Sequence, residues 1–377
     1  MIINCWIRRM GWIFLFTGLG LAGWGQDVEV SGILPADTLW GPNQTVLVKG
    51  DLTVPEHITI TILAGCVIQF DGLGGNLEVR GVLSVQGTVD APVFFQPAAG
   101  VNRWGGLFIN GETPGQPANL DYAVIERGGS NFASSTLSSQ CRILNASPRM
   151  QHCTFRDSSS TGLRLENSQA VLSDCVFTGN QDDAMQMTPS SSPILTKNSA
   201  MGNRFDGIRI DGGKIEGANI WRYSNLPYLV NDDIQIDSNA ALTIEAGAII
   251  QFAGLEDDLI AIGRLTAAGG NGNPVVFTSL NDMAANSWGG ILFSGNETNA
   301  SRLEYCELRH GGSYFASAAQ DAMIRCENAS PILRDCRIES SRNHGMSLVN
   351  STAALSSMQF KANARAAVSM DTASFPT

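Results

Sequence analysis

The chain has 377 residues, with 35 acidic against 24 basic side chains and a net charge of −11. This balance excludes a general nucleic-acid-binding surface, which requires a basic stripe. Charged residues make up only 16% of the chain, below the usual value of about 25%, and this favours many tight turns over long charged helix faces.

The first 25 residues have the pattern of a secretory signal. Arg8 and Arg9 supply a positive start, and the apolar run 12–24 that follows is too short for a typical membrane-spanning helix. We predict that residues 1–25 are a signal peptide and that the protein is secreted or held at the cell surface. No membrane span is then expected after signal removal. The alternative is an uncleaved N-terminal anchor.

The next residues predict a cap followed by strands. Residues 26–45 are polar and contain proline, which suits the N-terminal cap that a solenoid needs. From residue 46 apolar and polar side chains alternate over short stretches such as 58–62 and 77–79, and this is the period of β-strands. Since no window has a sustained helical stripe, we expect no long helix after the signal.

Two nested repeats organise the chain. The stretch 145–180 recurs in degenerate form at 328–363, about 183 residues further along the chain. Within the first stretch, Cys153 and Cys175 hold matching positions of a shorter repeat, with a period of roughly 22 residues. A short period inside a long one predicts a solenoid of about 22-residue coils that has been duplicated.

The long repeat divides the chain into two copies. We assign residues 46–219 to copy 1 and residues 220–377 to copy 2, which stops inside a repeat, next to the position matching Pro193. The expectation is that the chain is a fragment of, or a module in, a longer solenoid.

A coil of this length has room for a few short strands joined by turns. Stacked at about 4.8 Å, each strand would pair in parallel with its equivalents above and below. One row consists of residues 162–165, 184–187 and 207–210. Because side chains alternate between faces, six apolar residues of this row are predicted to point inward: Leu163, Leu165, Met185, Met187, Ile208 and Ile210.

Polar residues mark the outside and the turns of this row. Arg164, Gln186 and Arg209 are predicted to form an exposed row in vertical register. Asn180 and Asn203 precede the strands at matching turns, where Asn tolerates the left-handed conformation, and stacked Asn side chains can hydrogen-bond along the turn.

These patterns resemble the right-handed parallel β-helix proteins, the pectate-lyase-like superfamily in its broad sense. The units S-P-x-L-x-x-C and F-x-x-N-x-x-x-G-I look like generic coil repeats of that superfamily. The blocks LTIEAG…QF and WGG…L-x-Y look like those of exported bacterial β-helix proteins with no fixed activity. The resemblance covers roughly residues 40–377 and implies an all-β, single-stranded, right-handed parallel β-helix. A left-handed β-helix is disfavoured because its hexapeptide ladder is absent.

The cysteines are predicted to be interior residues. Seven follow Cys5, and several exchange with apolar residues in the other copy, as Cys66 does with Ala248. Such positions suit buried free thiols, and a disulfide between Cys153 and Cys175 of adjacent coils is the alternative. No C-x-x-C pair exists, so no zinc site is expected.

Three acidic residues and one arginine in or near the row are weak catalytic candidates: Asp182, Asp183, Asp206 and Arg209. The resemblance implies that lyases of this fold use Asp clusters for calcium with a basic residue as proton acceptor, and that glycosidases use carboxylate pairs. No catalytic motif is matched residue by residue, and copy 2 has Arg365 in place of Asp182. Turn-forming Asp is the preferred interpretation, so calcium is expected only for a lyase and no other metal or cofactor is expected.

The favoured function is an exported scaffold that binds polysaccharide, or another extracellular surface partner, without catalysis. Arg164, Gln186 and Arg209 are the predicted ligand-binding residues, and copy 1 is the predicted binding copy, suited to an acidic sugar. Trp104 and Trp288 serve either as structural residues or as sugar-stacking platforms. The alternative function is a polysaccharide lyase or glycoside hydrolase, which should carry one unrepeated acidic and basic cluster in a groove.

Overall fold

The structure is a computed structural model that describes residues 27–111, 118–129, 139–282, 288–313 and 322–377. The predicted signal peptide lies outside these residues. Within the described ranges no helix has the length and apolar character needed to cross a bilayer. The same ranges contain only two short 3-10 helices, η1 (Leu280–Asp282) and η2 (Asn296–Ala300), which confirms the expected absence of long helices there.

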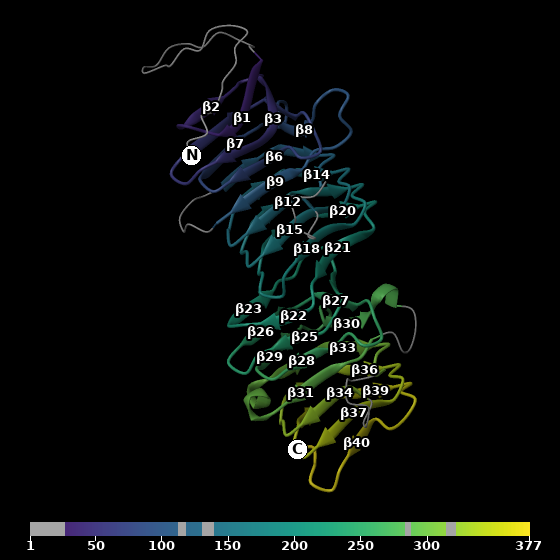
Figure 1. Ribbon diagram of the computed structural model, residues 1–377. Coiled ribbons are helices and arrows are strands. Elements are labelled where there is room, and N and C mark those ends of the chain that lie inside the picture. Colours follow the sequence, from purple (N-terminus) through teal and green to yellow (C-terminus); the bar gives the residue numbers. More distant parts are fainter. Residues whose placement is uncertain (1–26, 112–117, 130–138, 283–287, 314–321) are drawn as a thin grey trace. The chain divides into compact units, whose positions relative to one another are not determined.

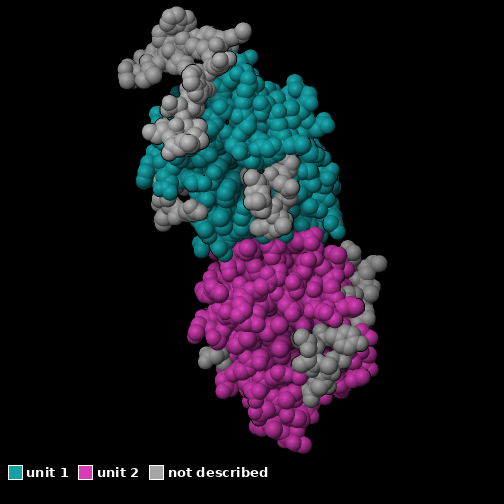
Figure 2. All heavy atoms as spheres, viewed as in Figure 1, with its two compact units in different colours: residues 1–186, 193–206 teal, residues 187–192, 207–377 magenta. Residues whose placement is uncertain are grey.

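Short parallel strands recur three to a coil and form three faces, which we number in the order that the chain visits them (Figure 1). The chain divides into two compact units, coloured in Figure 2. Unit 1 contains Met1–Gln186 and Pro193–Asp206, and unit 2 contains Met187–Ser192 and Gly207–Thr377. The copy boundary at residues 219 and 220 stays a prediction.

Unit 1 begins with β1 (Val28–Ile33), which lies inside the region 26–45 predicted as a cap and pairs with β3 (Thr45–Val54). Its first face consists of β2 (Thr38–Trp40), β4 (Thr59–Leu63), β7 (Val82–Gln86), β10 (Ala118–Asp121), β13 (Arg149–Gln151), β16 (Val171–Ser173) and β19 (Ile194–Thr196). The second face contains β5 (Val67–Phe70), β8 (Val93–Pro97), β11 (Ala123–Glu126), β14 (Thr154–Arg156), β17 (Val176–Thr178) and β20 (Ser199–Met201). The third contains β6 (Asn76–Val79), β9 (Gly106–Asn110), β12 (Ser139–Leu144), β15 (Thr161–Glu166) and β18 (Asp183–Met187).

Unit 2 repeats this plan. Its first face consists of β23 (Ala218–Trp221), β26 (Ala241–Glu245), β29 (Arg264–Ala268), β32 (Arg302–Glu304), β35 (Ile332–Arg334) and β38 (Ala354–Ser356). The second contains β21 (Phe205–Ile210), β24 (Tyr228–Val230), β27 (Ile249–Phe252), β30 (Val275–Ser279), β33 (Cys306–Arg309), β36 (Arg337–Glu339) and β39 (Gln359–Lys361). The third contains β22 (Gly213–Ile215), β25 (Ile234–Ile236), β28 (Leu259–Ala261), β31 (Ile291–Ser294), β34 (Ala322–Glu327), β37 (His344–Val349) and β40 (Val368–Met370).

Alternation along the strands fills the interior as the sequence predicts. All six apolar residues of the predicted row are fully buried, from Leu163 to Ile210. Equivalent side chains of successive coils stack, as Phe155 and Phe177 do with ring centroids 4.9 Å apart. The seven cysteines that follow the predicted signal are also buried and unbridged, as predicted for interior positions.

A single residue in the left-handed conformation makes each tight corner between the first and second faces. Tyr122 (φ 49°) separates β10 from β11, and Tyr305 (φ 48°) separates β32 from β33. In other coils His152, Asp174 and Asp335 take this conformation at the same corner. The left-handed residue turns the backbone sharply, so its own side chain lies at the corner and the next residue points inward.

At the next corner, between the second and third faces, asparagine side chains form a ladder of hydrogen bonds. The Nδ2 of Asn180 donates to Oδ1 of Asn203 at 2.7 Å and to the carbonyl of Phe155 at 3.2 Å. The predicted stacking of Asn180 on Asn203 is therefore confirmed, but the prediction that these two residues are left-handed is wrong. The left-handed conformation falls on Gly179 and Gly202, directly before them, because glycine adopts it without strain.

We predict that Asn180→Ala destabilises unit 1 by roughly 2–4 kcal/mol. The side chain is buried, and its Oδ1 accepts the backbone N–H of Ser158 at 3.1 Å and the side-chain amide of Gln140 at 3.3 Å. Its loss leaves several buried groups without partners. Urea unfolding measures the change, and the exposed Gln169→Ala is the control, expected to stay within about 0.5 kcal/mol. Equal losses for both variants would contradict the role of the ladder.

Candidate functional site

The predicted exposed row is only partly exposed. Gln186 and Arg209 are half-buried, whereas Arg164 is 3% exposed, so its predicted exposure is wrong. Arg164 and Gln186 belong to unit 1 and Arg209 to unit 2, and the vertical register of all three stays a prediction. Their predicted role in ligand binding likewise stays a prediction.

Arg164 is buried because it belongs to an ion-pair cluster on the third face. Arg142 donates two hydrogen bonds of 2.9 Å to the carboxylate of Glu166, and Nε of Arg164 donates to the same carboxylate at 2.7 Å. Burial opposes ionisation of Glu166, but the hydrogen bonds from both arginines hold the pKa of its carboxyl below the ordinary value. The Arg142 guanidinium also lies 5.0 Å from the centre of the Phe108 ring. Because Arg164 is paired in this way, its main role is structural.

The weak catalytic candidates occupy separate structural positions. Asp206 accepts the backbone N–H groups of Gly202 at 3.1 Å and Asn203 at 2.8 Å, so it forms a turn. Asp182 makes a solvent-exposed pair with Arg204 at 3.5 Å, and Asp183 is buried.

The fourth weak candidate lies in unit 2. Arg209 donates to Oδ1 of Asn231 at 3.3 Å. The preferred interpretation of turn-forming Asp fits Asp206, and catalysis by any of the four candidates stays untested.

The two repeated tryptophans are structural. Trp104 and Trp288 are fully buried, where they stack on Phe70 at 4.0 Å and on Phe252 at 4.2 Å. Each indole N–H donates to a backbone carbonyl at 2.8 Å. Neither ring is accessible to a sugar, which excludes the platform interpretation for both.

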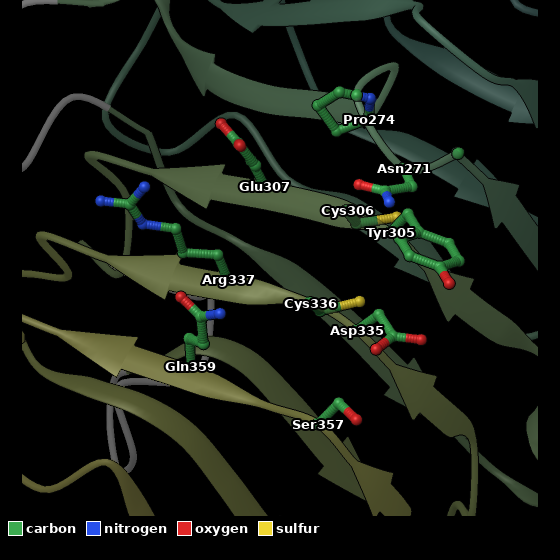
Figure 3. A pocket seen from close by; sticks show the side chains of 12 residues that line it. Asn271, Pro274, Tyr305, Cys306, Glu307, Asp335, Cys336, Arg337, Ser357 and Gln359 are labelled. Atoms are coloured by element: carbon green, nitrogen blue, oxygen red, sulfur yellow. The ribbon is translucent and has the colours of Figure 1, made fainter.

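A pocket of about 380 Å³ opens on the second face of unit 2 (Figure 3). Strand register brings Glu307, Arg337 and Gln359 into one column, since Glu307 pairs with Arg337 and Arg337 with Gln359. These three side chains point outward from successive coils. We call them the polar column.

The corner residues form a second column beside the first. Tyr305, Asp335 and Ser357 all have positive φ and lie at the same corner of successive coils. The turn at Asn271 and Pro274 borders the pocket next to Tyr305 (Figure 3). The site therefore combines a partly exposed tyrosine ring with carboxylate, guanidinium and amide groups, the mixture that binding pockets use to orient a polar ligand.

The matching surface of unit 1 is different. At the positions that the long repeat aligns with the polar column, unit 1 has Val124, Thr154 and Val176, which are also in register. Tyr122 is partly exposed like Tyr305, but its ring stacks on His152, with ring centroids 4.5 Å apart.

The pocket was missed by reasoning from the sequence, which favoured copy 1. Its signal was nevertheless available, because three apolar or neutral residues of copy 1 align with Glu307, Arg337 and Gln359 of copy 2. The alternation of copy 2 places these three residues outward. What the sequence could not show is that Tyr305 and the turn at Asn271 border the same surface.

A second group of acidic residues in unit 2 consists of Asp233, Asp257 and Asp258, whose pKa values are raised. Among the described residues no group of His, Cys, Asp and Glu is arranged to hold a metal ion. Asp258 is 2% exposed, and burial followed by the charge of Asp233 raises the pKa of its carboxyl to about 8. Asp257 and Glu256 add to this shift, and the pKa values of Asp233 and Asp257 are raised as well.

The matching position in unit 1 explains this acid. There Asn76 donates through Nδ2 to Oδ1 of Asp51 at 2.9 Å, and its backbone N–H donates to the same atom. In unit 2 the backbone N–H of Asp258 donates to Asp233 in the same way, at 2.9 Å. A protonated Asp258 therefore takes the structural place of an asparagine.

We predict that Asp258→Asn stabilises unit 2 above pH 4. The unfolded carboxyl ionises near pH 3.9 and the folded one near pH 8, so the free energy of unfolding of the parent protein should fall with rising pH across this interval and then level off. The variant should lose the part of this slope that Asp258 contributes and gain on the order of a few kcal/mol at pH 8. Thermal unfolding from pH 4 to 9 measures it. The reciprocal control, Asn76→Asp, should introduce a similar slope in unit 1, and flat profiles for all three proteins would refute the assignment.

Two family models match the chain. One describes a pectate-lyase-like β-helix domain and covers residues 212–322, and the other describes a right-handed β-helix region and covers residues 126–254. No curated protein matches the chain.

Several solved structures are similar at low identity. The A-module of mannuronan C-5 epimerase AlgE6 from Azotobacter vinelandii is 12% identical, with 88% of this chain and 90% of that chain covered and a TM-score of 0.34. The AlgE4 A-module of the same organism is 11% identical, with coverages of 88% and 91% and a TM-score of 0.34. The catalytic domain of a GH87 alpha-1,3-glucanase is 11% identical, with coverages of 93% and 64% and a TM-score of 0.23. By its strand ladders and the two matched regions, the chain is a right-handed parallel β-helix protein.

Proposed function

We propose that this β-helix binds a neutral polysaccharide at the pocket of unit 2 and does not cleave it. The observation that carries the proposal is the polar column beside the partly exposed Tyr305, which unit 1 lacks. An aromatic ring offers an apolar face with little entropy to lose, and the polar side chains can exchange hydrogen bonds with sugar hydroxyls.

Charge favours a neutral ligand over an acidic one. The pocket contains the carboxylates of Glu307 and Asp335 against the single guanidinium of Arg337, which also pairs with Glu339. The whole chain has a net charge of −11, and such a field repels polyanions. Because Arg164 is buried and paired, this pocket takes precedence over the acidic-sugar site expected on copy 1.

A solenoid suits weak, repeated contacts. Each coil adds one outward residue to a column, with a repeat of about 4.8 Å, so an extended chain can contact several coils at once. Single exposed contacts are weak, and affinity must come from several of them acting together. Secretion or cell-surface display, proposed from the pattern of residues 1–25, would bring the pocket into contact with such polymers.

A carbohydrate-active enzyme is the second candidate. The observation in its favour is that Glu307 and Asp335 line one pocket, since glycosidases use two carboxylates. Figure 3 shows them in different columns, with Glu307 on the strand of Cys306 and Asp335 beside Cys336, rather than facing one another. A calcium requirement is proposed only for the lyase form of this alternative.

We predict that exchanging the polar column for its unit 1 counterparts weakens binding strongly. The variant Glu307→Val, Arg337→Thr, Gln359→Val should lower retention on neutral glucans by roughly tenfold or more, because each lost buried hydrogen bond is worth about 1 kcal/mol. Affinity electrophoresis against neutral and acidic polysaccharides, with and without calcium, measures it. Tyr305→Ala should have a similar effect.

The matched control is Tyr122→Ala, which removes the unit 1 tyrosine that stacks on His152 and lies outside the pocket, and it should leave retention unchanged. Unaltered retention in the column variant would overturn the site. Release of reducing or unsaturated ends that disappears in Glu307→Gln would overturn the binding-only function and support the enzyme.

A further inference from the structure

Two cysteines lie side by side in the wall of the unit 2 pocket. Cys306 begins β33 and Cys336 precedes β36, and the register of Glu307 with Arg337 makes the two cysteines direct neighbours on adjacent coils. Paired strands are about 4.8 Å apart, and disulfides span Cα separations of about 4.4–6.8 Å. The backbone therefore already has the spacing that a disulfide requires.

Both sulfurs lie near backbone carbonyls. The sulfur of Cys306 lies 3.4 Å from the carbonyl oxygen of Glu304 and 3.5 Å from that of Ala267, and the sulfur of Cys336 lies 3.2 Å from that of Arg334 and 3.3 Å from that of Leu303. The neighbouring Cys306 thiol lowers the pKa of the Cys336 thiol, whereas burial raises the pKa of Cys306. Cys336 is thus the member of the pair with more thiolate character, and the thiolate is the nucleophile.

Unit 1 contains an internal comparison. Cys153 and Cys175 are also neighbours on adjacent coils, because Thr154 pairs with Val176. All four thiols are almost completely buried, with Cys153 and Cys175 0% exposed and Cys306 and Cys336 1% exposed. The two pairs share their register and the directions of their pKa shifts, and they differ in that Cys306 and Cys336 line the pocket.

We propose that Cys306 and Cys336 form a redox-active dithiol, which closes to a disulfide between coils when a low-molecular-weight disulfide enters the pocket. The Cys336 thiolate attacks one sulfur of the small disulfide and releases its other half as a thiolate. The Cys306 thiol then loses its proton and attacks Sγ of Cys336, which releases the second half. Two protein thiols are oxidised, and one small disulfide is reduced to two thiols.

The bond would fasten two coils of unit 2 to each other. It would close the segment of chain between Cys306 and Cys336, and closing a loop removes entropy from the unfolded chain. Oxidation should therefore raise the melting temperature of unit 2, and reduction should restore it. This property is independent of whether the pocket binds a sugar.

The test is oxidation of the native full-length chain with oxidised glutathione, followed by alkylation and tryptic mapping. Cleavage at arginine leaves Cys306 in peptide 303–309 and Cys336 in peptide 335–337. We expect these peptides to become joined at least about tenfold faster than those of Cys153 and Cys175, because Cys306 and Cys336 line the pocket that admits the oxidant and Cys153 and Cys175 do not. Peptides 303–309 and 335–337 that stay separate, or equal rates for both pairs, would overturn the proposal.

The variant Cys306→Ala separates the first step, attack by Cys336 on the small disulfide, from the second step, closure by Cys306. Unit 1 already places Ala123 beside Cys153 at the matching positions, so the substitution recreates packing that this fold accommodates. The variant should stop at a single glutathione adduct on Cys336, and its melting temperature should not respond to oxidation as that of the parent does. An unmodified Cys336 in this variant would show that the pocket does not admit the oxidant and would also overturn the proposal.

Discussion

Hydrogen bonding between in-register coils is the constraint on which the rest of this structure depends. Every strand of a face pairs in parallel with its equivalents in neighbouring coils, so equivalent residues recur at about 4.8 Å. A side chain is therefore a member of a column, and its chemistry is set by the residues one coil away. The stacked pair Phe155 and Phe177, the Asn180 ladder and the polar column at Glu307 all follow from this one rule.

The single-residue corner positions the side chains that form the pocket. A left-handed residue bends the chain within one position, so Tyr305 lies at the surface while the next residue, Cys306, is buried. Such conformations cost energy in residues other than glycine, and the corner recurs in most coils, so its main role is architectural. Function enters through the side chain placed there. The pocket and the neighbouring pair of thiols both result from this corner.

Comparison of the two units distinguishes the backbone geometry that they share from the side chains in which they differ. Tyr122 and Tyr305 have the same backbone conformation, but the first ring stacks on His152 and the second lies beside Asp335 in the pocket. Asn76 and Asp258 hold the same position, one as an amide and the other as an acid whose pKa is raised to about 8. Backbone geometry is retained at these positions while polar side chains differ. These differences give unit 2 a pocket lined by charged groups.

The sequence by itself determined the coil, the alternation of inward and outward side chains and the identity of the interior residues. The coil repeat and the strand period of two can both be read from the amino-acid sequence alone. Whether an outward residue is exposed was decided only by tertiary structure. Arg164 alternates outward yet is buried, since Arg142 and Glu166 of the same face close around it. The pocket also required tertiary structure, because a hollow exists only when residues from several coils and a turn border one space. Periodicity fixes direction, whereas access depends on neighbours that are distant along the chain.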